Sequence, residues 1–156
     1  MNGFNLVENG HFVNLLSPAD DNTTAATSEV FSMENWSHAS IVIHKGSGSA
    51  STIILEECTS FAGAGHRTFL PYQYAQEATA AGDTTDAALA AGTTAGVAFS
   101  ANDGTFLIFE INAAALSDGY PYVRFYFDVN AASEWGAMAI LSGGRYQKDI
   151  NATAIA

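Results

Sequence analysis

Apolar and polar residues alternate with a period of two along most of this chain. In "HASIVIHKG" (38–46), Ala39, Ile41 and Ile43 fall on one side, and the residues between them fall on the other. A period of two is that of a β-strand, because successive side chains of a strand point to opposite faces. The same pattern predicts further strands over 11–16, 28–33, 50–60, 97–100, 105–112, 122–129 and 134–143.

Three of these strands also show which face is buried. Their apolar positions repeat at every second residue, as expected for strands with one face in a core. The predicted core positions are Ile53 and Leu55 in the first strand, Leu107, Phe109 and Ile111 in the second, and Val123, Phe125, Phe127 and Val129 in the third.

Glycine-rich linkers separate several of the predicted strands. "GSGS" (46–49) follows one strand and precedes the next, and "ANDG" (101–104) lies between two others. Short linkers with Gly or Asp-Gly between alternating runs are typical of β-hairpins, so we predict a hairpin at each. "AAALSDG" (113–119) predicts a single helical turn that ends at Gly119.

Two segments are less regular. "TFLPYQYAQEA" (68–78) is extended and aromatic, but Pro71 cannot donate to a strand ladder, which places the segment at a sheet edge or a bulge. The alanines of 84–91 favour a helix, while the flanking Gly82 and Gly92 limit it to two turns, so a short helix and a loop fit equally. The aromatic residue before Pro121 raises the chance of a cis peptide bond there.

About nine strands with at most one or two short helices predict an all-β fold, either an antiparallel β-sandwich or a jelly-roll-like barrel. The length of 156 residues fits one β domain over 1–156. Residues 1–10 lack the alternation, and we interpret them as an N-terminal arm that could be ordered on docking, with Phe4 and Leu6 as anchors. A frayed terminus is the commoner fate of such ends.

Charge bears on the choice of partner. Asp and Glu number 16, against five Lys and Arg, and the formal net charge is −11. The basic residues are scattered, so no basic stripe is present to neutralise phosphates, and we expect neither nucleic acid nor an anionic membrane as a partner. Charged residues make up only 13% of the chain, about half the usual share, which is common among proteins that pack against other copies or other proteins.

Targeting and redox signals are sparse. Cys58 is the only cysteine, so no intrachain disulfide forms, and its place in an apolar strand favours a buried, inert thiol. The first residues lack the features of a signal peptide, and no apolar run approaches the ~18 residues of a membrane span. We therefore expect a soluble chain made in a cytoplasm.

No arrangement of residues predicts catalysis. His38 and His44 share a strand face but lie ~20 Å apart, too far to bind one metal ion. Glu56 and Glu110 each interrupt an apolar strand, and a solvated or interface carboxylate explains them better than acid–base work. Glycine-rich phosphate loops and nucleophile motifs are missing from the sequence. We expect no enzyme activity, no cofactor and no metal site.

Aromatic residues instead favour an interaction surface. On the strand 122–129, Tyr122, Arg124 and Tyr126 share the face opposite the predicted core, and it is too aromatic for plain solvent. Trp36, Trp135 and several tyrosines could alternatively form a sugar-binding platform, although a core or subunit-interface role is commoner. The full set of candidate interface residues is Phe4, Leu6, Trp36, Tyr72, Tyr74, Tyr122, Arg124 and Tyr126.

Four short motifs, in order, resemble a known group of proteins. They are "FVNLLSPAD", "VFSMENW", "LSDGYPY" and "AILSGGRY", and together they span about residues 12–146. The chain resembles small proteins encoded in the structural gene blocks of tailed bacteriophages. It departs from their pattern at Ser17, where proline is usual, and at Gly144, where alanine is usual.

The resemblance implies a component of the virion. Small acidic all-β phage proteins of this size are often capsid decoration (cement) proteins, which commonly sit as trimers on the head. It therefore implies a homotrimer on the capsid surface, bound to the major capsid protein. Two alternatives remain open: a head–tail, neck or tail-associated structural protein, and a carbohydrate or host-recognition module.

Overall fold

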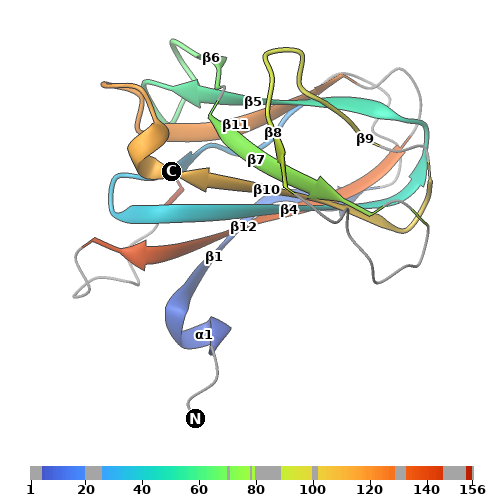
Figure 1. Ribbon diagram of the computed structural model, residues 1–156, viewed down its shortest axis with the longest axis horizontal. Helices are drawn as coiled ribbons and strands as arrows, with labels where there is room; N and C mark the ends of the chain where they lie inside the picture. The colour runs from blue at the N-terminus through green and yellow to red at the C-terminus, as the bar shows by residue number, and fades with distance from the viewer. Residues whose placement is uncertain are drawn as a thin grey trace.

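A computed structural model of the chain describes residues 5–19, 26–69, 71–77, 79, 89–99, 102–128, 133–145 and 154–155. It shows an all-β sandwich, as predicted, in which two antiparallel sheets pack face to face (Figure 1). In the described part of the chain, helical structure is limited to the four-residue α1 (Leu6–Asn9) and one 3₁₀ turn (Ala113–Ala115).

The first sheet, sheet A, contains the longest strands. Its strand order is β1-β12-β4-β10-β7-β8, and every neighbouring pair is antiparallel. The strands are β1 (Gly10–Ala19), β4 (Trp36–Gly48), β7 (Tyr72–Gln76), β8 (Ala90–Ala91), β10 (Thr105–Asn112) and β12 (Ser133–Gly144).

The second sheet, sheet B, covers one face of sheet A. Its main order is β2-β11-β5-β6, while β3 also pairs with β11 and β9 with β5. Its strands are β2 (Ala26–Thr27), β3 (Phe31–Ser32), β5 (Ser51–Cys58), β6 (Arg67–Thr68), β9 (Val97–Phe99) and β11 (Tyr122–Asp128).

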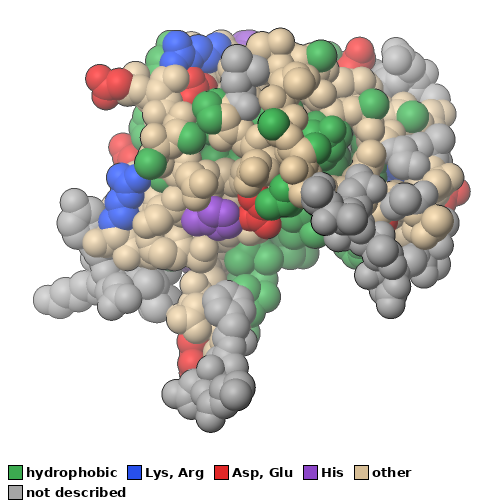
Figure 2. Space-filling view, viewed as in Figure 1, with side chains coloured by type: hydrophobic (Ala, Val, Ile, Leu, Met, Phe, Trp, Pro, Cys, Tyr) green, Lys and Arg blue, Asp and Glu red, His purple; other side chains and the backbone are tan. Residues whose placement is uncertain are grey.

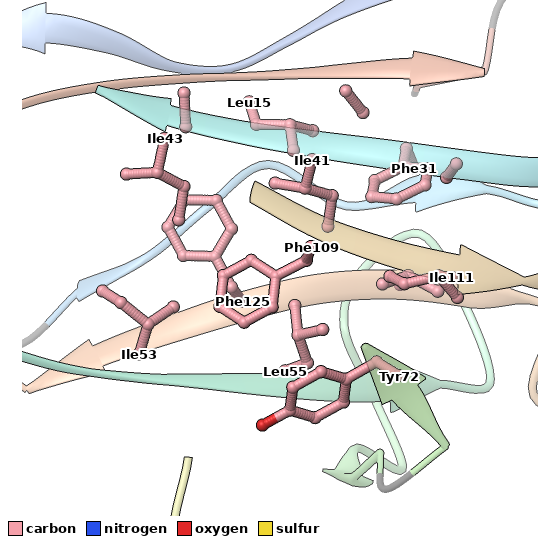
Figure 3. Packing of buried hydrophobic residues seen from close by; sticks show 14 of the residues in the cluster. Leu15, Phe31, Ile41, Ile43, Ile53, Leu55, Tyr72, Phe109, Ile111 and Phe125 are labelled. Carbon is pink, nitrogen blue, oxygen red and sulfur yellow. The ribbon is translucent and has the colours of Figure 1, made fainter. Parts of the chain in front are cut away.

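The core lies between the two sheets and is built from the predicted alternate positions. Ile41 and Ile43 of β4 face Ile53 and Leu55 of β5, and all four are at most 1% exposed. Phe109 and Phe125 reach into the same space from opposite sheets (Figure 3). Burial of one face of each strand confirms the predicted core positions, except Val129, which lies outside the described residues.

The two predicted hairpins are wrong. β4 pairs with β10 and β12 but not with β5, and β9 pairs with β5 but not with β10. Each glycine-rich linker is therefore an arch that carries the chain from one sheet to the other. In this arrangement the apolar faces on either side of the linker meet across the core, instead of lying side by side in one sheet.

The two arches are joined to each other at one end of the sandwich. The Gly104 amide donates to the Lys45 carbonyl at 3.0 Å, and the Gly48 amide donates to Asp103 Oδ1 at 3.0 Å. Lys45 is fully buried, and its ammonium lies 3.7 Å from Asp103 Oδ1. Burial lowers the pKa of Lys45, while the Asp103 carboxylate opposes that change. These polar contacts connect the two arches to each other.

Several predicted boundaries also change. The strand predicted over 28–33 is shortened to β3. At Ser28 the amide donates to the Phe125 carbonyl at 2.9 Å, and the Phe125 amide donates to the Ser28 hydroxyl at 3.0 Å. The extended segment around Pro71 connects β6 of sheet B to β7 of sheet A. In sheet A, β7 is the second strand from the edge, and the two-residue β8 is the edge strand. The peptide bond before Pro121 is trans. Most of the segment 84–91 lies outside the described residues, and its last two residues form β8.

Replacing Phe109 with Ala is expected to destabilise the fold by ~3–5 kcal/mol, because it empties a fully buried site between the sheets. Phe106→Ala, on the outward face of the same strand and 37% exposed, is the matched control and should cost about 1 kcal/mol or less. Urea unfolding measures both. Equal costs for the two variants would contradict the described arrangement of β10.

Candidate functional site

The outward face of sheet A carries an unusual number of apolar side chains. On neighbouring strands, Met138 of β12 lies beside Val42 of β4, and Val42 beside Ile108 of β10. Phe12 of β1 is 47% exposed, Met138 is 45% exposed and Phe106 is 37% exposed. We call this surface the apolar face, and its residues are Phe12, Val42, Phe106, Ile108, Met138 and Ile140.

A groove of about 390 Å³ opens on the apolar face. Leu16, Val42, Phe106 and Met138 contribute apolar walls, and His44 stacks on Phe106 with ring centroids 4.4 Å apart. The pairing of β1 with β12 shifts register twice between Asn14 and Ala19, so β1 departs from regular pairing where the groove lies. The irregular edge strand and the stacked rings together form a concave, mainly apolar site.

One polar cluster borders the apolar face. The Ser40 hydroxyl donates to Glu110 Oε2 at 2.7 Å, and His38 Nε2 lies 3.0 Å from the same oxygen. Glu110 is thus held by side chains of β4. On sheet B, Glu56 accepts from Arg124 Nε at 2.7 Å and lies 3.2 Å from His66 Nδ1. Both carboxylates that interrupt apolar strands have polar partners within the chain.

The predicted interface on β11 is partly covered by the chain itself. Tyr122, Arg124 and Tyr126 share the outward face, as the alternation predicts, and all three are half-buried. The ring of Tyr122 lies 4.6 Å from that of Phe61, in the loop between β5 and β6, and Arg124 is bonded to Glu56. The β5–β6 loop therefore occupies part of the surface that the sequence assigned to a partner.

The remaining predicted interface residues have different surroundings. Trp36 and Tyr72 are 5% and 3% exposed, which leaves them little surface to offer a partner. Tyr72 packs edge-on against Phe109, donates its hydroxyl to the Thr93 carbonyl at 3.2 Å, and has its pKa raised by burial. Tyr74 is partly buried against the same core. Phe4 lies outside the described residues.

A sugar-binding platform on the two tryptophans does not fit this arrangement. Trp135 is 2% exposed and packs against Phe99 and Phe127 inside the sandwich, while Trp36 stacks on His11. A sugar stacks on an indole face that solvent can reach. Neither indole offers such a face.

Leu6 belongs to a segment that stands away from the sandwich. The helix α1 precedes β1, and in Figure 1 it extends from the body of the molecule. It has no buried residue, and Val7 is 82% exposed. Figure 2 shows hydrophobic side chains gathered where this segment leaves the sandwich. We call residues 5–9 the N-terminal segment.

A buried carboxylate organises the "SDGYP" turn. Glu57 is 2% exposed; its Oε2 accepts from the Ser117 amide at 2.9 Å and its Oε1 from Arg67 Nε at 2.5 Å. Arg67 in turn lies 4.0 Å above the ring of Tyr120, and Gly119 has a φ of 81°, which favours glycine. The contacts join β5, β6 and the turn. This role for Glu57 is structural.

The described residues were also compared with the requirements of a reactive thiol, a metal site and a membrane span. Cys58 is buried, and burial raises the pKa of its thiol, so the thiol form predominates at neutral pH. The described His, Cys, Asp and Glu side chains form no group of three that could hold a metal ion. Within the same residues, helices long and apolar enough to span a bilayer are absent.

The sequence contains a signal for the apolar face at the positions between the core residues of β10 and β12. Phe106 and Ile108 alternate with the core residues of β10, and Met138 and Ile140 do so on β12. A strand that is apolar on both faces is expected to be covered on both faces. Sheet B covers one face of these strands, and part of the other is exposed.

Comparison with known proteins gives one informative likeness. The chain is similar to the crystal structure of the SPBc2 prophage-derived protein YomS, with a TM-score of 0.51 and 15% sequence identity. The match covers 86% of this chain and 93% of that one, so the likeness extends over most of the chain. At this identity it shows a shared fold. Neither a protein-family model nor a curated protein matches the sequence.

Glu57→Gln is expected to cost ~1.5–3 kcal/mol at neutral pH, because it weakens two hydrogen bonds to a buried charge. Burial raises the pKa of Glu57, but bonds from Ser117 and Arg67 outweigh this and lower it below the usual 4.5. Its contribution is therefore complete above that value and is lost as the pH falls through the lowered pKa. Urea unfolding from pH 7 to pH 3 should show the variant losing less stability than the wild type on acidification. Parallel curves would contradict the assignment.

Proposed function

We propose that this chain is a non-enzymatic structural protein of a bacteriophage particle, and that it decorates the head by binding the major capsid protein. The exposed N-terminal segment carries the proposal, because it holds two apolar residues, Leu6 and Val7, that are not buried in the fold, as a docking element would. The resemblance of the sequence motifs to phage structural proteins supports it. So does the fold shared with a prophage-derived protein.

The N-terminal segment has the properties that an anchor needs. A four-residue helix has little stability of its own, since helix nucleation is unfavourable and short helices depend on packing. Leu6 and Val7 are apolar, yet α1 buries neither of them in this chain. Docking against the shell would bury both and supply the missing packing. Many copies, each with a modest contact, would together reinforce the shell.

The remaining parts of the proposal follow from the same family resemblance. The protein is made in the host cytoplasm, assembles with other copies of itself as a homotrimer, and resides on the outer surface of the capsid. Glu56, Glu57 and Glu110 serve the fold, since each accepts hydrogen bonds from the chain's own side chains or backbone.

Copy number in purified particles tests the location. Quantitative mass spectrometry against the major shell protein should find this chain in hundreds of copies, because decoration repeats with the shell lattice. A handful of copies would contradict decoration and favour the neck or tail. Absence from the particle would refute a structural role in the virion.

Val7→Asp should weaken attachment to undecorated heads about tenfold or more, since docking would then bury an unpaired charge. Asn5→Asp is the matched control, because it adds the same charge at the helix N-cap, where Asp is well tolerated. Co-sedimentation with heads measures attachment, and thermal unfolding should be unchanged in both variants. If Val7→Asp binds as tightly as Asn5→Asp, the N-terminal segment is not the anchor.

A further inference from the structure

A carboxylate lies at one end of the groove on the apolar face. Glu134 of β12 is on the outward side of sheet A, as Gly136 and Met138 are, and it lines the groove with them. Its Oε2 rests over the backbone of Gly46 on β4, because a Cβ added to Gly46 would lie only 2.8 Å from this oxygen. The glycine at position 46 thus lets the carboxylate lie against the sheet.

This carboxylate is unpaired. In the part of the chain that the structure describes, Glu134 makes no hydrogen bond and no ion pair through its side chain. Glu110 shares the outward face of sheet A, but it lies 3.0 Å from His38 Nε2. On sheet B, Glu56 accepts from Arg124 Nε at 2.7 Å. Glu134 therefore retains a charge that these other carboxylates share with partners in the fold.

The described basic side chains of the chain lie away from the groove. Lys45 is fully buried at an arch, and Arg67 and Arg124 bind carboxylates of sheet B. Arg145 follows the end of β12 that is farther from Glu134. A cation for Glu134 must therefore come from another molecule.

The free energy of covering the groove depends on that cation. Glu134 is only partly buried, so water solvates its charge in the free chain. A neutral apolar group seated in the groove would displace this water and leave the carboxylate unpaired, which is unfavourable. A group that brings a cation replaces the lost water with an ion pair. Charge complementarity thus selects a basic occupant.

The groove walls fit a long side chain with an apolar stem. Met138 and Glu134 are four residues apart on the outward side of β12, or ~13 Å, and Gly136 between them adds no side chain. Phe106 lines the groove from β10, with its ring stacked on that of His44. Lys and Arg lay their methylene stems on such apolar surface and keep the charged end polar, and an aromatic face attracts a cation.

The surroundings of the groove favour a protein as the source of that side chain. Phe12, Ile108 and Ile140 extend the apolar face beyond the groove, and Phe12 is 47% exposed. A small free amine would leave these residues uncovered, whereas a protein surface covers them together with the groove. Arg is enriched at protein interfaces and among their hot spots. The net charge of −11 favours a basic partner over a second copy of this chain.

We propose that the groove binds a Lys or Arg side chain of a partner protein, with the stem between Phe106 and Met138 and the cation on Glu134. The partner surface then presents a basic residue among apolar ones. The inference concerns the isolated chain and does not rest on the proposed role in a virion. It goes beyond that role by giving the chemistry that a partner needs at this site.

NMR titration of the full chain tests the groove. The probe is acetyl-Leu-Ser-Arg-Ser-Leu-amide, in which the Arg and both Leu side chains share one face when the peptide is extended. The Met138 methyl group and the Gly46 and Gly136 amides should shift on binding. Replacing Arg in the peptide by citrulline, its neutral isostere, should weaken binding about threefold or more, as expected for a partly exposed ion pair.

Two variants test the role of the carboxylate. Glu134→Gln should abolish the preference for the arginine peptide over the citrulline peptide, because it removes the charge and keeps the shape. Glu110→Gln is the matched control on the same face. Glu110 pairs with Ser40, six residues or ~20 Å along β4 from Gly46, so the preference should persist. Thermal unfolding should be unchanged in Glu134→Gln, since no described hydrogen bond is lost.

Acetylarginine amide distinguishes a protein partner from a small free cation. It should bind more weakly than the arginine peptide, because it cannot cover the apolar face around the groove. Binding as tight as that of the peptide would assign the groove to a small cation and overturn the proposal.

Other results would also overturn it. They are an arginine peptide that shifts none of the groove signals, equal binding of the arginine and citrulline peptides, and a preference that survives Glu134→Gln. Self-association of the wild type that Glu134→Gln reverses, measured by sedimentation velocity, would assign the groove to a second copy instead. Absence of the chain from virus particles would refute the virion role and leave these titrations unaffected, so the two failures can be told apart.

Discussion

The structure depends on the burial of two apolar sheet faces against each other. Phe109 of sheet A and Phe125 of sheet B reach into the same space, with Ile41 beside them, and these side chains are at most 1% exposed. Since side chains alternate along a strand, burial of these positions also determines which residues point outward. The core thereby places Phe12, Phe106 and Met138 together on one surface.

Several polar groups in this protein connect separate segments of the fold to one another. Lys45 and Asp103 join the two arches, Glu57 holds the "SDGYP" turn, and Glu56 binds Arg124. Several of the few charged side chains in the described part of the chain take part in contacts of this kind. The outward face of sheet A, by contrast, carries Val42, Ile108 and Met138 side by side on neighbouring strands.

Two features of the described residues expose apolar side chains, and they have different forms. The N-terminal segment is a short helix that buries none of its residues, and its stability depends on packing, as that of short helices does. The apolar face is part of the sheet and is already ordered by the core.

The sequence by itself determined the fold class and the core face of each strand, because alternation is a local property that one strand displays without its neighbours. Ile41, Phe109 and Phe125 could be assigned in this way. It did not determine which strands pair, since the glycine-rich linkers that resemble hairpins are arches between sheets. Nor did it show that Trp36 and Tyr72 are buried or that the β5–β6 loop covers Tyr122. These outcomes rest on contacts between segments far apart in the chain, and only the tertiary structure brings those segments together.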